Sequence, residues 1–111
     1  LCPEVLRATF HDPGDHAGEL ETSLVLHLHG ELVEMEQAGD GRTVPFAIEA
    51  ISQPGVWTPR PWSQTHPDTG CGEPRQATRE KGKAFFDAAS DAVATMLVAF
   101  SQASKGQTPY V

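Results

Sequence analysis

The sequence predicts one small domain in which amphipathic helices pack against a sheet. The clearest observation is a long helical pattern that begins near Thr78, because apolar residues recur there at steps of three and four. These residues are Phe85, Phe86, Ala89, Val93, Leu97 and Phe100. A second helical pattern runs from about Thr22 to His29. Between the two patterns, residues 44–51 are short and carry a proline, so a strand or edge segment is at least as good a prediction as a helix.

The N-terminal part of the chain is predicted to be short elements and loop. Residues 3–9 form either a helical turn that begins at Pro3 or a linker. Residues 10–15 form a loop, because Asp-Pro and Gly-Asp are turn-forming pairs. The helix that follows can be capped by Thr22 or Ser23.

The best candidates for chemistry lie where this loop meets the helix. His16 is in the loop, and Glu21 falls at the cap or in the first turn of the helix, where the helix dipole favours a carboxylate by about 0.3–1 kcal/mol. A neutral imidazole beside carboxylates can accept and return a proton near neutral pH. The alternative is that His16 is a surface or capping residue, which is common before helices.

Length and charge exclude some classes of partner. The chain of 111 residues is long enough for one domain at most, and its net charge is −7. Nucleic acids and anionic membrane surfaces are polyanions that favour basic patches, so neither is predicted as a partner. No apolar run approaches the roughly 20 residues that span a bilayer, and residues 1–4 have no secretory signal character.

The cysteines and the paired histidines predict no metal ligand in this chain. Cys2 and Cys71 lack the close spacing of a metal site, and we interpret them as free thiols of a reducing compartment, which predicts a cytoplasmic location. His27 and His29 are two residues apart, so on a helix they point to different faces.

A long stretch rich in proline and glycine covers residues 53–70. Such connections inside a domain are usually functional or disordered, and Trp57 and Trp62 favour order. The stretch is either a lid or subunit-contact loop, or a loop packed on its own domain. His66, which lies in this stretch, is a second candidate site residue.

Two segments resemble one enzyme family. Residues 16–23, His-Ala-Gly-Glu-Leu-Glu-Thr-Ser, resemble the loop-to-helix segment of the creatininase (creatinine amidohydrolase) family. Residues 70–82, Gly-Cys-Gly-Glu-Pro-Arg-Gln-Ala-Thr-Arg-Glu-Lys-Gly, resemble the segment that leads into the last helix of that family. The two segments are in the right order and at the right separation, so the resemblance covers roughly residues 10–103.

The resemblance implies an α/β fold. The family has a three-layer sandwich with a mainly parallel sheet, and this chain would be its C-terminal half. Residues 1–103 would form this C-terminal portion, and residues 104–111 would be a tail that is disordered or contacts a partner.

The resemblance also implies a metal-dependent amidohydrolase that acts on a small, often cyclic, amide. Family members use two divalent ions, such as Zn, Mn or Fe, whose ligands lie in the first half of the domain, and no part of this chain matches those positions. We therefore expect an N-terminal half of the same domain as a separate chain. Family members form homo-oligomers, often hexamers, which is the assembly expected for the complete unit.

Roles for individual residues follow from the same resemblance. His16 would pass a proton to the leaving nitrogen and Glu21 would orient it, which makes these two the predicted catalytic residues. Asp12, Asp15 and His66 are the predicted substrate contacts. The best-known members carry a tryptophan and an aspartate where this chain has Asp12 and Pro13, which argues against creatinine itself as the substrate.

A non-catalytic function is the alternative. A creatininase-like subunit that lost its metal ligands could serve assembly through the loop that carries Trp57 and Trp62. Retention of His16 and Glu21 argues against this alternative, because a binding module does not need a proton donor at that place.

Overall fold

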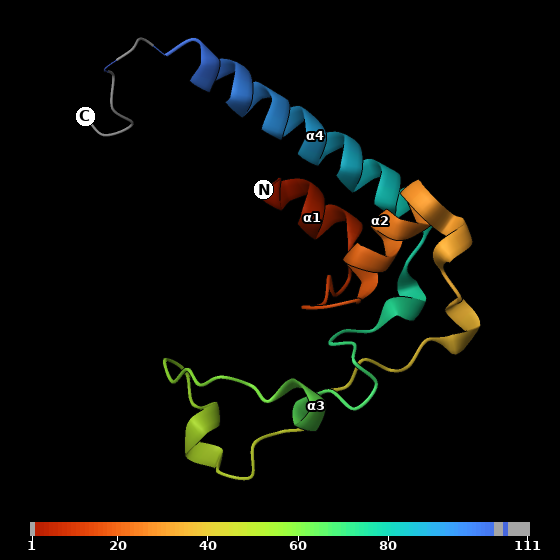
Figure 1. Ribbon diagram of the computed structural model, residues 1–111, viewed down its shortest axis with the longest axis vertical. Helices are drawn as coiled ribbons and strands as arrows, with labels where there is room; N and C mark the ends of the chain where they lie inside the picture. Colours follow the sequence, from red (N-terminus) through yellow and green to blue (C-terminus); the bar gives the residue numbers. More distant parts are fainter. Residues whose placement is uncertain (1, 104–105, 107–111) are drawn as a thin grey trace.

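The computed structural model describes residues 2–103 and 106, which form helices joined by long loops (Figure 1). The α-helices are α1 (Pro3–Thr9), α2 (Glu19–His29), α3 (Trp62–Thr65) and α4 (Arg79–Ser101). The short 3-10 helices are η1 (Gly30–Leu32), η2 (Met35–Gln37), η3 (Glu49–Ser52) and η4 (Pro74–Gln76). The chain measures 52 × 39 × 23 Å, and the segment between η2 and α3 extends away from the other helices as an arm.

The long C-terminal helix is present as predicted. It begins after Thr78, whose hydroxyl accepts a hydrogen bond from the main-chain N–H of Lys81 at 3.2 Å and so caps the first turn. α1 and α2 pack against α4 (Figure 1). At the end of α1, the buried ring of Phe10 meets the ring of Phe85 edge to face at 5.8 Å.

α2 and α4 approach each other closely at Ser23 and Gly82. A Cβ atom on Gly82 would lie 1.9 Å from the carbonyl oxygen of Ser23, so only glycine fits at this crossing. The buried Ser23 hydroxyl donates to the carbonyl of Glu19 at 2.6 Å and accepts from the N–H of Thr78 at 3.1 Å. The start of α4 is therefore fixed directly on α2.

A buried carboxylate ties the loop before α2 to α4. Glu19 accepts hydrogen bonds from the main-chain N–H groups of His11 and Asp12 at 3.0 and 3.1 Å, and it forms an ion pair with Lys81. Burial raises the pKa of Glu19, but the hydrogen bonds from Lys81 and from the main chain outweigh it and hold the pKa below the usual value. Glu19 is therefore ionised at neutral pH.

The predicted sheet is wrong for this chain. The described residues contain no strand, and their only β pairing is an isolated antiparallel bridge between His16 and Cys71. In residues 44–51, the N–H of Val44 donates one hydrogen bond to the distant carbonyl of Thr65, which is not a β bridge, and η3 begins at Glu49. A strand requires a neighbour that accepts a ladder of hydrogen bonds, and Pro45 has no N–H to contribute.

Of the two alternatives for residues 3–9, the helix is confirmed as α1. The start of α2 differs from the prediction, because α2 begins at Glu19 with Gly18 as its N-cap, so Thr22 and Ser23 lie inside the helix instead of capping it. The end of α2 at His29 agrees with the prediction. The predicted tail, residues 104–111, lies outside the described residues except for Gly106, and the boundary at residue 103 stays a prediction.

Within the described part of the chain, α4 is long and apolar enough to span a membrane by length and composition, with a mean hydropathy of 1.3 over 18 residues. The criterion concerns length and composition alone, so the expectation that the chain does not contact a membrane stays a prediction. Core helices of other proteins pass the same criterion; α4 contacts α1 and α2, but none of this window is buried in the described residues. Phe86, Val93 and Leu97 line a shallow apolar hollow with Leu24 of α2, as in a helix that covers a protein surface.

We predict that Gly82→Ala lowers the free energy of unfolding by about 1–3 kcal/mol, because the added methyl group overlaps the Ser23 carbonyl and forces α2 and α4 apart. Denaturant unfolding measures the change. The control is Lys83→Ala, whose exposed ion pair with Asp87 is worth little. Equal stability of the two variants would contradict the close crossing.

Glu19→Gln should lower the free energy of unfolding at pH 7 by about 1.5–3 kcal/mol, because it removes a charge that accepts three hydrogen bonds. Since folding lowers the pKa of Glu19, its contribution is present above the usual value of 4.5 and is lost as the pH falls through the folded pKa. Unfolding measured from pH 7 to pH 3 should show the difference shrinking below about pH 4.5. The matched control is Glu80→Gln, which makes the same chemical change at an exposed side chain of α4.

Candidate functional site

The loop that carries His16 is held in place by main-chain contacts with a distant segment. The N–H groups of Asp15 and His16 donate to the carbonyl of Cys71 at 2.7 and 3.0 Å, and the N–H of Cys71 donates to the carbonyl of His16 at 2.7 Å. Gly72 has φ +135, and a Cβ atom there would lie 2.6 Å from the Cα of Gly14. Glycine is therefore required for this close approach, which fixes the position of the main chain from which the His16 side chain extends.

The carboxylate of Glu21 lies beside the imidazole. Its Oε2 is 3.7 Å from Nδ1 of His16 and accepts a hydrogen bond from the main-chain N–H of Ala17 at 2.6 Å. The side chains of His16 and Glu21 are 55% and 53% exposed. The distance is longer than a hydrogen bond, so the two side chains are neighbours without a direct bond. An exposed imidazole beside a fixed carboxylate can accept and return a proton.

Asp15 forms an ion pair with Arg60 from the long loop. Nη2 of Arg60 is 2.6 Å from Oδ2 of Asp15. The hydrogen bond from Arg60 holds the pKa of Asp15 below the usual 3.8, and the same bond raises the pKa of Arg60. Asp15 is therefore an anion at neutral pH. Pro59 and Pro61 flank Arg60 and restrict its backbone.

The indole of Trp62 lies between the two candidate histidines. Its ring centroid is 5.5 Å from that of His16, in an edge-to-face arrangement, and 4.1 Å from that of His66. His66 is only 1% exposed, and its Nδ1 lies 3.4 Å from the hydroxyl of Thr43. Its Nε2 is buried and has no hydrogen-bond partner among the described residues. A buried nitrogen without a partner is costly, so this atom is a candidate ligand contact.

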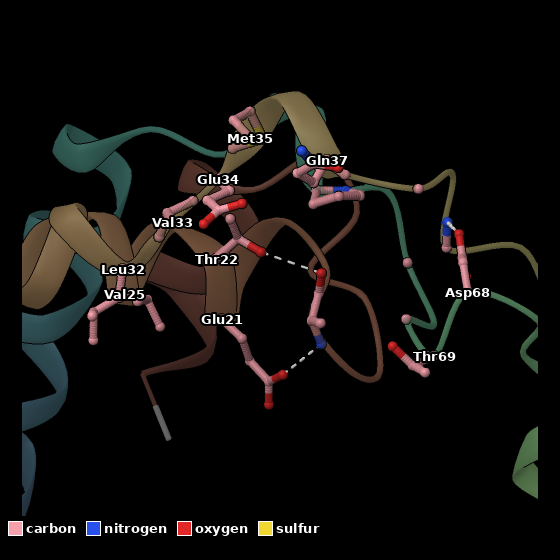
Figure 2. A pocket seen from close by; sticks show the side chains of 17 residues that line it. Glu21, Thr22, Val25, Leu32, Val33, Glu34, Met35, Gln37, Asp68 and Thr69 are labelled. Carbon is pink, nitrogen blue, oxygen red and sulfur yellow. Dashed lines mark hydrogen bonds between the residues drawn. The ribbon is translucent and has the colours of Figure 1, made fainter.

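A hollow of about 420 Å³ lies beside the candidate site (Figure 2). Glu21 lines it, as do Thr22 and Asp68. Glu21 accepts a hydrogen bond from the N–H of Ala17 and Thr22 donates one to the carbonyl of the same residue; dashed lines from the labelled Glu21 and Thr22 mark them in Figure 2. Val25, Leu32, Val33 and Met35 form its apolar side. The volume is within the range of small-molecule sites, and Glu21 belongs both to the hollow and to the pair with His16.

The structure brings four of the five predicted site residues together. His16 and Glu21 are neighbours, Asp15 precedes His16, and His66 lies against Trp62, which contacts His16. Their functions stay predictions. Asp12 is different, because its carboxylate accepts a hydrogen bond from the N–H of Gly14 at 3.2 Å and makes none with the other four in the part of the chain that the structure describes.

Sequence reasoning missed Arg60 and Thr43. Both lie far from the His16 loop in sequence, and Arg60 reaches Asp15 across 45 residues. The sequence did contain a signal for Arg60. Pro59 and Pro61 restrict its backbone, which is typical of a cation held in one place.

The described residues do not fit a metal centre by themselves. Among residues 2–103 and 106, no group of three or more histidine, cysteine, aspartate or glutamate side chains is arranged to hold a metal ion. Cys2 and Cys71 are free thiols, and Cys2 donates to the carbonyl of Ala88 at 3.2 Å.

Comparison with known proteins places these observations in one family. A family model described as creatininase, creatinine amidohydrolase, matches residues 2–97. No curated protein matches the chain. A crystal structure from Bacteroides fragilis, named "Putative creatinine amidohydrolase", is similar with a TM-score of 0.82 and 36% sequence identity. The match covers 94% of this chain and 42% of that one, so the chain spans about two fifths of its length. The chain belongs to the creatininase family.

Proposed function

We propose that this chain supplies the proton-transfer and substrate-contact residues of an amidohydrolase that cleaves the C–N bond of a small amide, cyclic amides included. Membership of the creatininase family supports an amidohydrolase-like activity. The single observation that carries the proposal is the placement of His16, which the main chain of Cys71 holds beside the carboxylate of Glu21.

His16 is the proton carrier of the proposed reaction. When water adds to the carbonyl carbon and the C–N bond breaks, the leaving nitrogen needs a proton, because an amide anion is a poor leaving group. His16 accepts a proton from the water as it adds, and the imidazolium so formed donates that proton to the leaving nitrogen as the C–N bond breaks. The hydrogen bond from the N–H of Ala17 keeps the carboxylate of Glu21 beside the ring of His16 during this transfer.

Asp15 and His66 are the proposed polar contacts to substrate. Asp15 is anionic and held by Arg60, so it can accept hydrogen bonds from substrate N–H groups. The partnerless Nε2 of His66 is the second contact. Asp12 is the third proposed contact, because its side chain is exposed and, among the described residues, only its Oδ1 accepts a hydrogen bond, from the N–H of Gly14. The hollow that shares Glu21 is large enough for a small amide.

The metal ions and the remainder of the domain are also proposals. A chain that spans about two fifths of a similar structure, and whose described residues form no ligand group, supports ligands supplied from outside this chain. We propose that an N-terminal half in a separate chain holds divalent ions, Zn, Mn or Fe, and that the complete unit forms a homo-oligomer, a hexamer, in the cytoplasm. No step proposed above passes through these ions.

One observation favours a second candidate function, a non-catalytic assembly subunit. Trp57 is 84% exposed, and Val56 and Ile48 on the same arm are also exposed. Exposed apolar side chains of this size mark contacts with other proteins. The two functions differ in the role of His16, since only the catalytic function requires it for turnover.

His16→Ala should reduce amide hydrolysis by about 10²–10⁴-fold without loss of bound metal, because it removes the proton donor but no proposed metal ligand. Steady-state kinetics and metal analysis of the purified protein check both parts. The control is His11→Ala, since His11 uses only its main-chain N–H in the fold. Full activity of the His16 variant would remove His16 from the mechanism.

Native mass spectrometry should show this chain together with a second polypeptide, and metal analysis should find about two divalent ions per pair, as in two-metal hydrolases. The test requires protein purified from its source without denaturation. A mass of 12.0 kDa with no companion, in an active preparation, would contradict the two-chain arrangement.

A further inference from the structure

The indole of Trp62 is fixed on three sides before it meets His16. Its Nε1–H donates to the carbonyl of Thr69 at 2.9 Å, its ring lies 4.1 Å from the buried ring of His66, and the guanidinium of Arg60 lies 5.2 Å from the ring centroid. The N–H of His66 also donates to the carbonyl of Trp62 at 2.8 Å, which closes the turn of α3. The indole is therefore a rigid surface.

His16, in contrast, has little else to set the angle of its ring. Its main chain is bonded to Cys71, but its side chain is half exposed, and Glu21 lies beyond hydrogen-bond distance at 3.7 Å. The contact with Trp62 has an interplanar angle of 84° and a centroid distance of 5.5 Å. Aromatic rings favour this edge-to-face geometry, which restricts both rotation and displacement of the imidazole.

We propose that Trp62 is a positioning residue for His16: its indole, held by Thr69 and His66, keeps the imidazole at the angle needed for proton transfer. The importance of this angle for turnover rests on the function proposed above, but the contact itself does not. Proton transfer requires the donor atom within hydrogen-bond reach of the leaving nitrogen, and small displacements of a reacting group lower the rate steeply.

The chain offers matched controls for both members of the contact. Trp57 is the second tryptophan of the same loop and is 84% exposed, so Trp57→Leu makes the same chemical change without touching His16. His27 has its own aromatic neighbour, Phe86, at a centroid distance of 5.7 Å. Phe86→Leu should therefore disturb His27 and leave His16 alone.

NMR spectra of the imidazole C–H groups, recorded on the protein as purified, test the contact. The signals of His16 are those that disappear in His16→Ala. Trp62→Leu should shift and broaden the signals of His16 and leave those of His27 unchanged, and Phe86→Leu should do the reverse. Trp57→Leu should change neither. If the His16 signals in Trp62→Leu match those in Trp57→Leu, the positioning contact does not exist.

Turnover tests the consequence. Trp62→Leu should lower kcat by about 10–100-fold because the proton donor is misplaced, and it should raise KM by a smaller factor because Trp62 also packs against His66, a proposed substrate contact. Trp62→Phe keeps a flat ring against His66 and should recover part of kcat, which also separates positioning from failure to fold. A change in KM alone would overturn the proposal. If His16→Ala keeps full activity while Trp62→Leu still moves the His16 signals, the proposed function fails and the contact stands.

Discussion

The carboxylate of Glu19 is the interaction on which the rest of the structure depends. It joins three parts of the chain, because it belongs to α2, accepts from the loop at His11 and Asp12, and pairs with Lys81 of α4. The free energy lost when an ionised carboxylate is removed from water must be offset by hydrogen bonds and an ion pair, so few other arrangements of these segments are stable. The His16 loop starts from this fixed point, so the position of the candidate site follows from a buried charge and not from an apolar core.

Few apolar side chains are buried in the described residues, and close main-chain contacts replace much of the usual core. Phe10 and Ala77 are the buried hydrophobic residues, whereas Glu19, Ser23 and His66 are buried and polar. The crossing at Gly82 and the approach of Gly72 to Gly14 bring backbone against backbone. At these glycines even an alanine is too large, because its methyl group would overlap the facing main chain. The same molecule leaves large apolar side chains exposed on α4.

Local signals were sufficient to predict some elements. The start of α4 at Thr78 and the end of α2 at His29 follow from capping and periodicity, and the motif around His16 led to the family. The start of α2 was missed because Glu19 is fixed by Lys81, 62 residues away. The sheet was inferred from the family, and no residue that the structure describes pairs with residues 44–51 as a strand. The pairing of His16 with Glu21 was predicted because it is local, whereas the contacts of Arg60 and Thr43 were missed because they join distant segments.

The bridge between His16 and Cys71 has a consequence for how the molecule forms. It closes a long loop, and the ion pair from Asp15 to Arg60 closes another of 45 residues. The entropy of loop closure must be lost before such contacts return any stability, so structures with distant contacts fold slowly. α4 can form early from local interactions, whereas the imidazole reaches its place only when the chain has returned to Cys71. The candidate site is therefore among the last parts of the molecule to assemble, and nascent or partly folded chains have no organised site.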